Sequence, residues 1–184
     1  KRVADPAWME TFQETRTRLQ SMILVHEKLY QSSDLSAVDF CDYTQILVKE
    51  LQSTSIRNQQ IQFRVNAEPL TLPIELAQPC GMIFVELITN VIKYAYPSDT
   101  TGEAEVSVRT RNNSVELIVQ DHGTGIPIDF DPIKSNSFGW QLIRRLSAQL
   151  NGNFLIERND GTKVTISFPL PAISDSTAIQ KAGV

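Results

Sequence analysis

Three polar residues within residues 84–95 (F-V-E-L-I-T-N-V-I-K-Y-A) have side chains that could act together chemically. Glu86, Asn90 and Lys93 stand at i, i+4 and i+7, which places them on one face of a helix. A carboxylate, an amide oxygen and an ammonium on one stripe can supply a general base, a metal ligand and a phosphate-binding charge. The same stripe also fits a solvated helix face that carries an ion pair, so by itself it leaves both interpretations open.

A second group of residues reads D-H-G-T-G and directly follows the strand-like run L-I-V-Q. Gly123 and Gly125 allow a backbone to pass close to a ligand or to adopt a positive φ. Asp121, at the end of the strand, could accept a hydrogen bond from an amino group such as adenine N6. A plain turn would show the same short pattern.

Two further short motifs lie nearer the carboxyl end of the chain. Ser137 is a candidate N-cap for a helix that begins near residue 138, and Gly139 lies in its first turn. A helix amino terminus after a loop is a natural phosphate site, although a capped helix with a glycine for close packing looks the same. Gly161 and Thr162 precede the last predicted strand, where a simple hairpin is the alternative.

The amino-terminal part of the chain, residues 1–55, is predicted to be a helical arm. Asp5-Pro6 is a helix-start signal, and apolar residues recur at three- and four-residue spacing from Trp8 to Tyr30. These features predict one amphipathic helix that ends near residue 32. A second helix is predicted from about residue 39 to residue 55.

Residues 56–171 are predicted to form an α+β domain, because the period of the apolar residues changes near residue 60. Helices are expected at 75–95 and 138–150, with a loop rich in Gly and Pro at 121–137. Strands are expected at 61–65, 104–110, 115–120, 154–158 and 163–169, with room for another short strand between Pro69 and Pro73. Residues 172–184 are predicted to be a loose tail.

The composition limits the class of protein. The 184 residues contain 17 Lys and Arg against 21 Asp and Glu, a net charge of −4, and 41% are hydrophobic. This excludes a disordered or fibrous chain, and the absence of a basic stripe argues against nucleic acid as a partner. No apolar run approaches the roughly 18 to 20 residues that span a bilayer. We therefore expect a cytoplasmic chain without membrane contact, although a longer parent protein could be membrane-tethered.

The order and spacing of the four motifs together resemble the ATP-binding domain shared by histidine kinases, gyrase, Hsp90 and MutL, called the Bergerat or GHKL fold. In the arm, R-L-Q-S-M-I-L-V-H-E-K-L-Y at residues 18–30 resembles the second dimerisation helix of sensor histidine kinases related to the HWE subgroup. The resemblance covers residues 1–169. It implies a two-layer α/β sandwich with a mixed sheet, preceded by a helical dimerisation arm.

The resemblance also implies ATP and Mg²⁺ as cofactors and gives each motif a role. Asn90 would coordinate Mg²⁺, Glu86 would orient or deprotonate the attacking group, and Lys93 would lie near the phosphates. Asp121 would accept from the adenine amino group, and this favours ATP over GTP. Further nucleotide-binding residues would be Gly123, Gly125, Ser137, Gly139, Gly161 and Thr162, of which Thr162 would support Asp121.

Two positions depart from the family pattern. Many relatives have Gly where this chain has Ser137 and Leu where it has Trp140. The first change is familiar in the subgroup, whereas the second has no interpretation from the sequence.

The function that the resemblance implies is that of the catalytic core of a two-component sensor histidine kinase. Such a core transfers the γ-phosphate of ATP to a His on a dimerisation helix, for relay to an Asp of a response regulator. The full-length protein would be a homodimer through its dimerisation helices. The helix that bears the phosphoacceptor would precede Asp5, so we expect a fragment that cannot phosphorylate itself alone. His26 and His122 are interpreted as a packing residue and a loop residue, not as acceptors.

Two other functions remain open on sequence grounds. The chain could be a degenerate Bergerat-fold phosphotransferase or regulatory binding module that no longer turns over ATP. A serine kinase of the anti-sigma-factor type would share the nucleotide motifs but would lack the long arm helix. Glu86, Asn90 and Asp121 are all present, and this favours a working nucleotide site.

Overall fold

The computed structural model describes residues 37–53, 61–97, 100–158 and 160–170, together with five separate residues of the arm. These five are exposed and helical: Phe12, Thr15, Arg16, Leu19 and Ile23. Most of the helix predicted before residue 32 and the tail at 172–184 lie outside the described residues.

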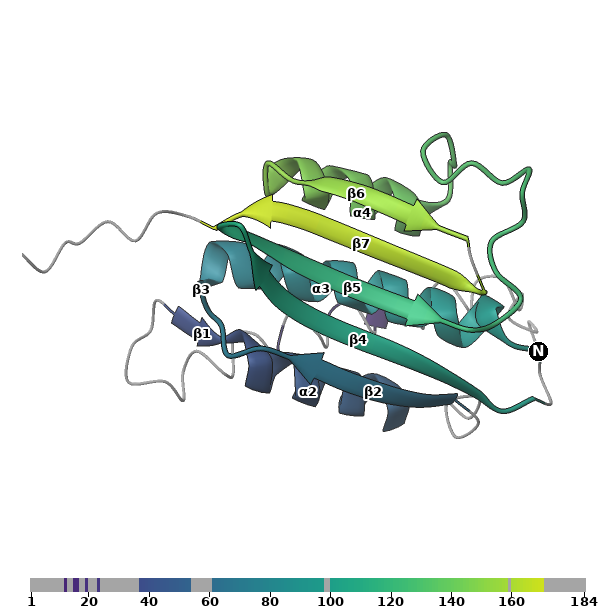
Figure 1. Ribbon diagram of the computed structural model, residues 1–184, viewed down its shortest axis with the longest axis horizontal. Helices are drawn as coiled ribbons and strands as arrows, with labels where there is room; N and C mark the ends of the chain where they lie inside the picture. The colour runs from purple at the N-terminus through teal and green to yellow at the C-terminus, as the bar shows by residue number, and fades with distance from the viewer. Residues whose placement is uncertain are drawn as a thin grey trace, which may run out of the picture.

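A five-stranded sheet forms one layer of the domain (Figure 1). Its strands, in spatial order, are β2 (Ile61–Ala67), β4 (Gly102–Arg111), β5 (Ser114–Asp121), β7 (Thr162–Pro169) and β6 (Asn153–Glu157). β2 runs parallel to β4, and the other neighbours are antiparallel. The mixed sheet implied by the family resemblance is therefore confirmed.

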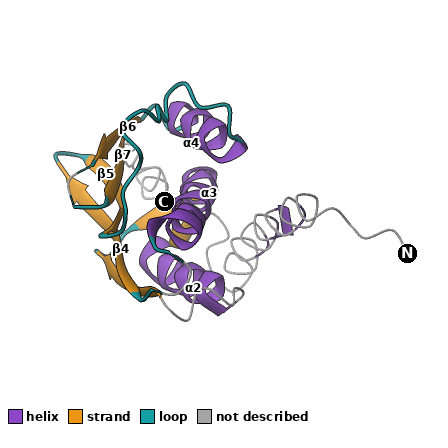
Figure 2. Ribbon diagram, turned by 90° about the vertical axis from the view of Figure 1, so that its right-hand side faces the viewer, coloured by secondary structure: helices purple, strands orange, loops and turns teal. Residues whose placement is uncertain are grey.

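Within residues 37–170, three helices form the second layer and lie on one face of the sheet (Figure 2). They are α2 (Phe40–Ser53), α3 (Ile74–Asn90) and α4 (Phe138–Gln149). A π-helical turn, η2 (Val91–Ala95), continues α3. Such turns insert one residue into the helical hydrogen-bond ladder and are frequent at functional sites.

Alternation along the strands sends apolar side chains into the space between the two layers. Val106, Leu117 and Ile166 of the sheet and Ile83 and Ile88 of α3 are buried there. α3 is the central helix of its layer and is apolar on most sides, so it occupies the middle of the core.

The hairpin between β4 and β5 turns through Asn112 and Asn113, both with positive φ (49° and 60°). Arg111 pairs with Ser114, so the connection has two residues. Two consecutive residues of positive φ match the twist of antiparallel strands, and asparagine tolerates this conformation. The strands predicted at 104–110 and 115–120 are thus present and form a hairpin.

The second helix of the predicted arm, α2, shares the core of the sheet. Its buried residues include Phe40, Tyr43 and Leu47, and the Phe40 ring stacks on that of Phe84 in α3 with centroids 6.1 Å apart. A short strand, β1 (Ala37–Asp39), leads into α2 and pairs antiparallel with β3 (Thr71–Pro73). α2 therefore packs as part of the α/β layers, while the boundary placed near residue 55 remains a prediction.

Among the described residues, one helical stretch is long and apolar enough to cross a membrane by length and composition. It is Ile74–Ala95, that is α3 with η2, and 61% of its apolar window is buried within the protein. By this criterion the sequence prediction that no apolar stretch reaches spanning length is wrong. The burial is that of a core helix, which is apolar all round because it packs on the sheet and on two neighbouring helices.

Candidate nucleotide-binding site

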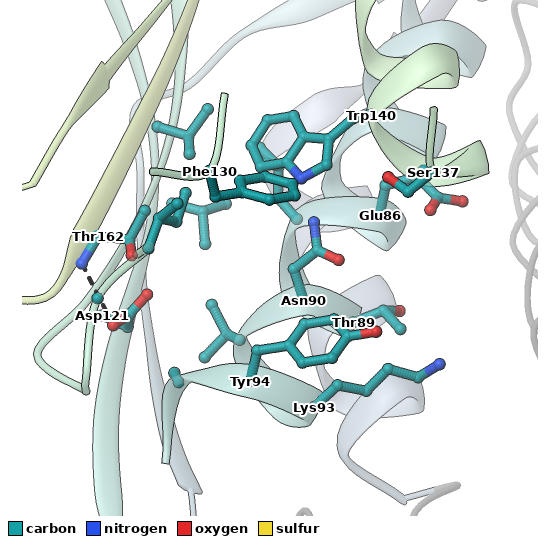
Figure 3. Close-up of a pocket in the computed structure, with 18 of the residues that line it drawn as sticks. Glu86, Thr89, Asn90, Lys93, Tyr94, Asp121, Phe130, Ser137, Trp140 and Thr162 are labelled. Carbon is teal, nitrogen blue, oxygen red and sulfur yellow. Dashed lines mark hydrogen bonds between the residues drawn. The ribbon is translucent and has the colours of Figure 1, made fainter. Parts of the chain in front are cut away.

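A cavity of about 520 Å³ lies between α3 and the carboxyl end of the sheet strand β5, and α4 closes one side of it. In Figure 3 Asp121 and Thr162 lie on the sheet wall, and Glu86, Asn90 and Lys93 project from the helix wall. Eight of the ten residues predicted for the site line this one cavity: Glu86, Asn90, Lys93, Asp121, Gly125, Ser137, Gly139 and Thr162. Motifs that lie up to 76 positions apart in the chain (162 − 86 = 76) thus converge.

Asp121 is the most constrained of the polar groups in the cavity. Its side chain is 5% exposed, and Oδ1 accepts backbone N–H groups of Gly123 at 2.9 Å and Thr162 at 3.3 Å. Burial raises the pKa of the Asp121 carboxyl above its usual value, and the two backbone N–H donors only partly offset this. The carboxylate is therefore fixed in orientation at the wall of the cavity.

Gly123 and Gly161 do not line the cavity but lie directly behind Asp121. A Cβ at Gly123 would overlap the carbonyl of Ala95, which accepts the N–H of Thr124 at 2.8 Å. Gly161 has φ +103°, and a Cβ there would overlap the Asp121 carbonyl. Only glycine fits at either position, because the loop after β5 passes against the end of η2 and against the turn before β7.

Tyr96, directly after the π turn, ties this loop to the sheet. Its hydroxyl donates to the Glu103 carbonyl at 2.5 Å and accepts the N–H groups of Glu103 at 3.2 Å and His122 at 3.1 Å. A single side chain thereby fixes the backbone next to Asp121. The imidazole of His122 lies 3.5 Å from the exposed carboxylate of Asp160.

Asn90 faces the cavity with an unsatisfied polar atom. Its amide Nδ2 is buried and has no hydrogen-bond partner among the described residues. A buried amide without a partner costs free energy, so its persistence in a cavity wall points to a ligand that completes it. This is the single feature of the cavity that most directly signals a bound molecule.

The carboxylate of Glu86 lies at the amino terminus of α4. Glu86 is 4% exposed, and a Cβ at Gly139 would lie 2.7 Å from its Oε2. Glycine in the first turn of α4 therefore lets that helix end approach α3. Ser137 occupies the predicted N-cap position of α4, although its side chain makes no capping hydrogen bond.

Several lining residues were not predicted from the sequence. Tyr94 is 68% exposed at the cavity mouth, next to Lys93 in the same motif. Phe130 belongs to the loop rich in Gly and Pro, where no periodicity singles it out. Trp140, noted only as a departure from the family pattern, is 7% exposed and forms part of the wall near the start of α4.

The residues present fit a Mg²⁺ ion that is held mainly by a ligand. The described residues contain no cluster of three or more His, Cys, Asp and Glu side chains that could hold a metal by themselves. Mg²⁺ is commonly bound by one or two protein oxygens plus phosphates of the substrate. The amide oxygen of Asn90 would supply such an oxygen.

Comparison with known proteins identifies the family of the chain. Residues 76–172 match the family described as histidine kinase-, DNA gyrase B-, and HSP90-like ATPase. The chain therefore belongs to this family of ATPases. Residues 1–55 match the HisKA_2 family of histidine kinases, so the chain combines a GHKL catalytic domain with the HWE-type segment of a sensor histidine kinase.

Individual relatives are also sensor kinases. The sensor histidine kinase PdtaS of Mycobacterium tuberculosis is 26% identical over 175 residues, which covers 92% of this chain and 34% of PdtaS. Blue-light-activated histidine kinase 2 of Erythrobacter litoralis is 29% identical over 112 residues, covering 60% of this chain and 32% of that protein. The chain thus spans about a third of the length of these relatives.

Solved structures show the same fold. The histidine kinase domain of the Erythrobacter litoralis EL346 blue-light activated kinase superposes with a TM-score of 0.77 at 21% identity. The superposition covers 85% of this chain and 75% of that one. The ATP binding domain of PrrB from Mycobacterium tuberculosis gives a TM-score of 0.61 at 15% identity and covers 74% of this chain and 97% of that one. The GHKL fold expected from the sequence is therefore confirmed.

Proposed function

We propose that the cavity binds ATP with Mg²⁺ and that the chain is the catalytic core of a two-component sensor histidine kinase. The observation that carries this proposal is the buried, unpartnered amide of Asn90 in a cavity whose opposite wall holds the fixed carboxylate of Asp121. The unpartnered Nδ2 is a donor that suits a phosphate oxygen, the Oδ1 of the same amide suits a metal ion, and the Asp121 carboxylate suits the base.

Base recognition follows from the way Asp121 is held. A carboxylate is an acceptor and pairs with the exocyclic amino group of adenine, whereas the corresponding carbonyl of guanine would leave two acceptors facing each other. Because two backbone N–H groups hold Oδ1, the carboxylate has little freedom to turn away from a wrong base. Adenine selectivity would therefore be large.

The phosphates would lie toward α4 and Lys93. The first turn of α4 offers backbone N–H groups and the positive end of the helix dipole, and Gly139 keeps the approach clear of a side chain. Lys93 adds a positive charge at the cavity wall. A bound Mg²⁺ would neutralise charge that develops on the phosphates during transfer.

The reaction needs mainly positioning by this chain. The bond between the γ-phosphorus and the oxygen that bridges it to the β-phosphate would break, and ADP would leave with the electron pair. A bond to a ring nitrogen of a histidine on a dimerisation helix would form. Glu86 would orient that imidazole or accept its proton, and the phosphoryl group would then pass to an aspartate of a response regulator.

The partners and the domain division belong to the same proposal. The match of residues 1–55 to a histidine kinase family supports a homodimer through dimerisation helices. We place the arm at residues 1–55, of which α2 packs on the catalytic domain, the catalytic domain at 56–171 and a tail at 172–184. The names of the relatives support a response regulator as the downstream partner.

Calorimetric titration with a non-hydrolysable ATP analogue, with and without Mg²⁺, tests the binding step. We expect saturable binding that Mg²⁺ strengthens, and weaker binding of the GTP analogue. Asn90→Ala should remove the Mg²⁺-dependent gain, about tenfold or more, while circular dichroism stays unchanged. Asn66→Ala, an exposed asparagine on β2, is the matched control and should bind like the wild type.

Two outcomes would decide against the proposal. If Asn90→Ala keeps the full Mg²⁺-dependent gain, the metal role of Asn90 is wrong. If the wild type binds no nucleotide under any condition, the chain is a degenerate regulatory module of the same fold.

A further inference from the structure

The segment between Gly125 and α4, residues 126–137, covers one side of the cavity and is here called the lid. Ile126, Pro127, Phe130 and Ser137 of the lid line the cavity. The lid contains no strand or α-helix. Something other than regular secondary structure must therefore hold it in place.

Hydrogen bonds within the lid are few and short-range. The N–H of Phe130 donates to the Pro127 carbonyl at 3.1 Å, and that of Lys134 donates to the Asp131 carbonyl at 3.1 Å. The Asp131 side chain accepts the N–H of Ile133 at 2.9 Å. These bonds shape local turns, but they do not connect the lid to the rest of the domain.

Arg144, two turns into α4, makes that connection. Its Nη1 donates to the Pro132 carbonyl at 2.7 Å, and its Nη2 donates to the Ser135 carbonyl at 3.1 Å. Both bonds are partly buried. The planar fork of one guanidinium thus holds two lid carbonyls three residues apart, a geometry that an ammonium cannot reproduce.

Two other side chains also bond to lid carbonyls. Arg158, just after β6, donates from Nη2 to the carbonyl of Phe130 at 2.9 Å. Gln141 of α4 donates to the carbonyl of Asn136 at 2.8 Å. Both of these bonds are exposed to solvent, whereas those of Arg144 are partly shielded, so Arg144 makes the strongest link.

The charge of Arg144 is directed at neutral carbonyls. Within the part of the chain that the structure describes, no carboxylate lies within ion-pair distance of its guanidinium. Charge-assisted bonds to backbone carbonyls are stronger than neutral ones. The Arg144 guanidinium thus bonds to the lid backbone and not to a surface carboxylate.

We propose that Arg144 is a positioning residue that fixes the lid over the cavity and so sets how long a bound ligand stays there. The contacts between Arg144 and the lid lie within this chain and do not depend on a ligand. The identity of the ligand rests on the function proposed above. Arg144 does not line the cavity, so it acts through the lid and not by touching the ligand.

Hydrogen exchange of the ligand-free protein tests the hold directly, with Arg144→Gln against Arg145→Gln. Arg145 is the neighbouring arginine on α4 and is exposed, so its substitution removes the same charge without touching the lid. Amides of residues 128–136 should exchange about tenfold faster in Arg144→Gln, and at the wild-type rate in Arg145→Gln. Equal lid exchange in the two variants would overturn the proposal.

Dissociation of a fluorescent ATP analogue, followed by stopped flow, tests the consequence for the ligand. Arg144→Gln should release the analogue about tenfold faster with an unchanged preference for adenine over guanine. Arg144→Lys keeps the charge and should fall between wild type and Arg144→Gln. A merely structural role would instead lower the melting temperature and leave the dissociation rate of the folded protein unchanged.

The two measurements separate this inference from the proposed function. If the wild type binds no nucleotide, the proposed function fails, while lid exchange still decides whether Arg144 holds the lid. If Arg144→Gln changes dissociation without changing lid exchange, the residue acts by another route and the inference is wrong.

Discussion

The two sides of the cavity are built in different ways. The side that carries Asp121 is held by backbone contacts: N–H groups of Gly123 and Thr162 bond its carboxylate, and glycines allow close approach of the chain. The lid side is held by side chains that reach backbone carbonyls, chiefly from Arg144. The groups proposed to select the ligand are thus fixed by the backbone, whereas the lid depends on a small number of side-chain hydrogen bonds.

Exposure shows the same contrast. Asp121 is 5% exposed, while Ile128 and Ile133 of the lid are 94% and 64% exposed. Buried polar groups with fixed partners are expensive to disturb, and exposed apolar side chains contribute little to the free energy of folding. Substitutions on the Asp121 side and substitutions in the lid should therefore differ in which property they change, stability or binding, and in how much they change it.

The largest expected effect is on the Asp121 side. In Gly123→Ala the added Cβ would overlap the carbonyl of Ala95, so the loop must shift and the Thr124 bond weakens. We expect about 2 kcal/mol of lost stability in urea unfolding, together with loss of nucleotide affinity. Ile128→Ala, in the lid, should stay within about 0.5 kcal/mol of wild type. Similar losses for both variants would remove the contrast.

The pH dependence of nucleotide binding should follow the protonation of Asp121. It therefore tests the Asp121 side of the cavity separately from the lid side. Burial raises the pKa of the Asp121 carboxyl, so this side chain takes up a proton at a higher pH than an exposed aspartate does. As the pH falls through that raised pKa, affinity for an ATP analogue should drop by up to about tenfold, because the acceptor is lost. Calorimetry across the acidic range would measure this drop.

Stability of the ligand-free protein should show the opposite sign. A carboxyl whose pKa is higher in the folded state binds a proton more readily when folded, so its contribution to the free energy of unfolding rises as the pH falls through this window. Asp121→Asn can keep Oδ1 as the acceptor for the two backbone groups and should lose both dependences. A wild-type binding profile that Asp121→Asn reproduces would show that another group titrates.

Tyr96→Phe should have a smaller effect than Gly123→Ala, because it removes one hydroxyl and leaves the ring against Gly102. The N–H groups of Glu103 and His122 would lose their acceptor, and solvent can replace it because these bonds are exposed. We expect a loss of about 1 kcal/mol in stability and a few-fold weaker binding. Hydrogen exchange should speed up at residues 121–124 and not in the lid. Faster exchange in the lid would mean that the two sides are coupled.

Much of this arrangement could be predicted from the sequence. The stripe of Glu86, Asn90 and Lys93 lies on a long periodic helix, and Asp121 ends a clearly alternating strand, so local pattern was enough to place them. The order of the motifs then placed both walls in one cavity. Local periodicity predicts such elements well because burial of one face enforces it.

Other features depend on contacts that no local pattern reveals. The π turn at Val91–Ala95 changes the helical repeat by only one residue, so the sequence still reads as one helix. Strand β1 has three residues and exists through pairing with β3, more than thirty positions away. The side chain of Arg144 meets the lid only in the folded chain, and in the sequence it is one of two adjacent arginines on a polar face.

Trp140 gives the protein an optical probe of its own cavity. Indole emission depends on solvent contact and on nearby polar groups, and this ring is 7% exposed in the wall beside the lid. The chain has one other tryptophan, Trp8. Replacing Trp8 with Phe would leave a single emitter whose spectrum and quenching by acrylamide report events at the cavity without any attached label.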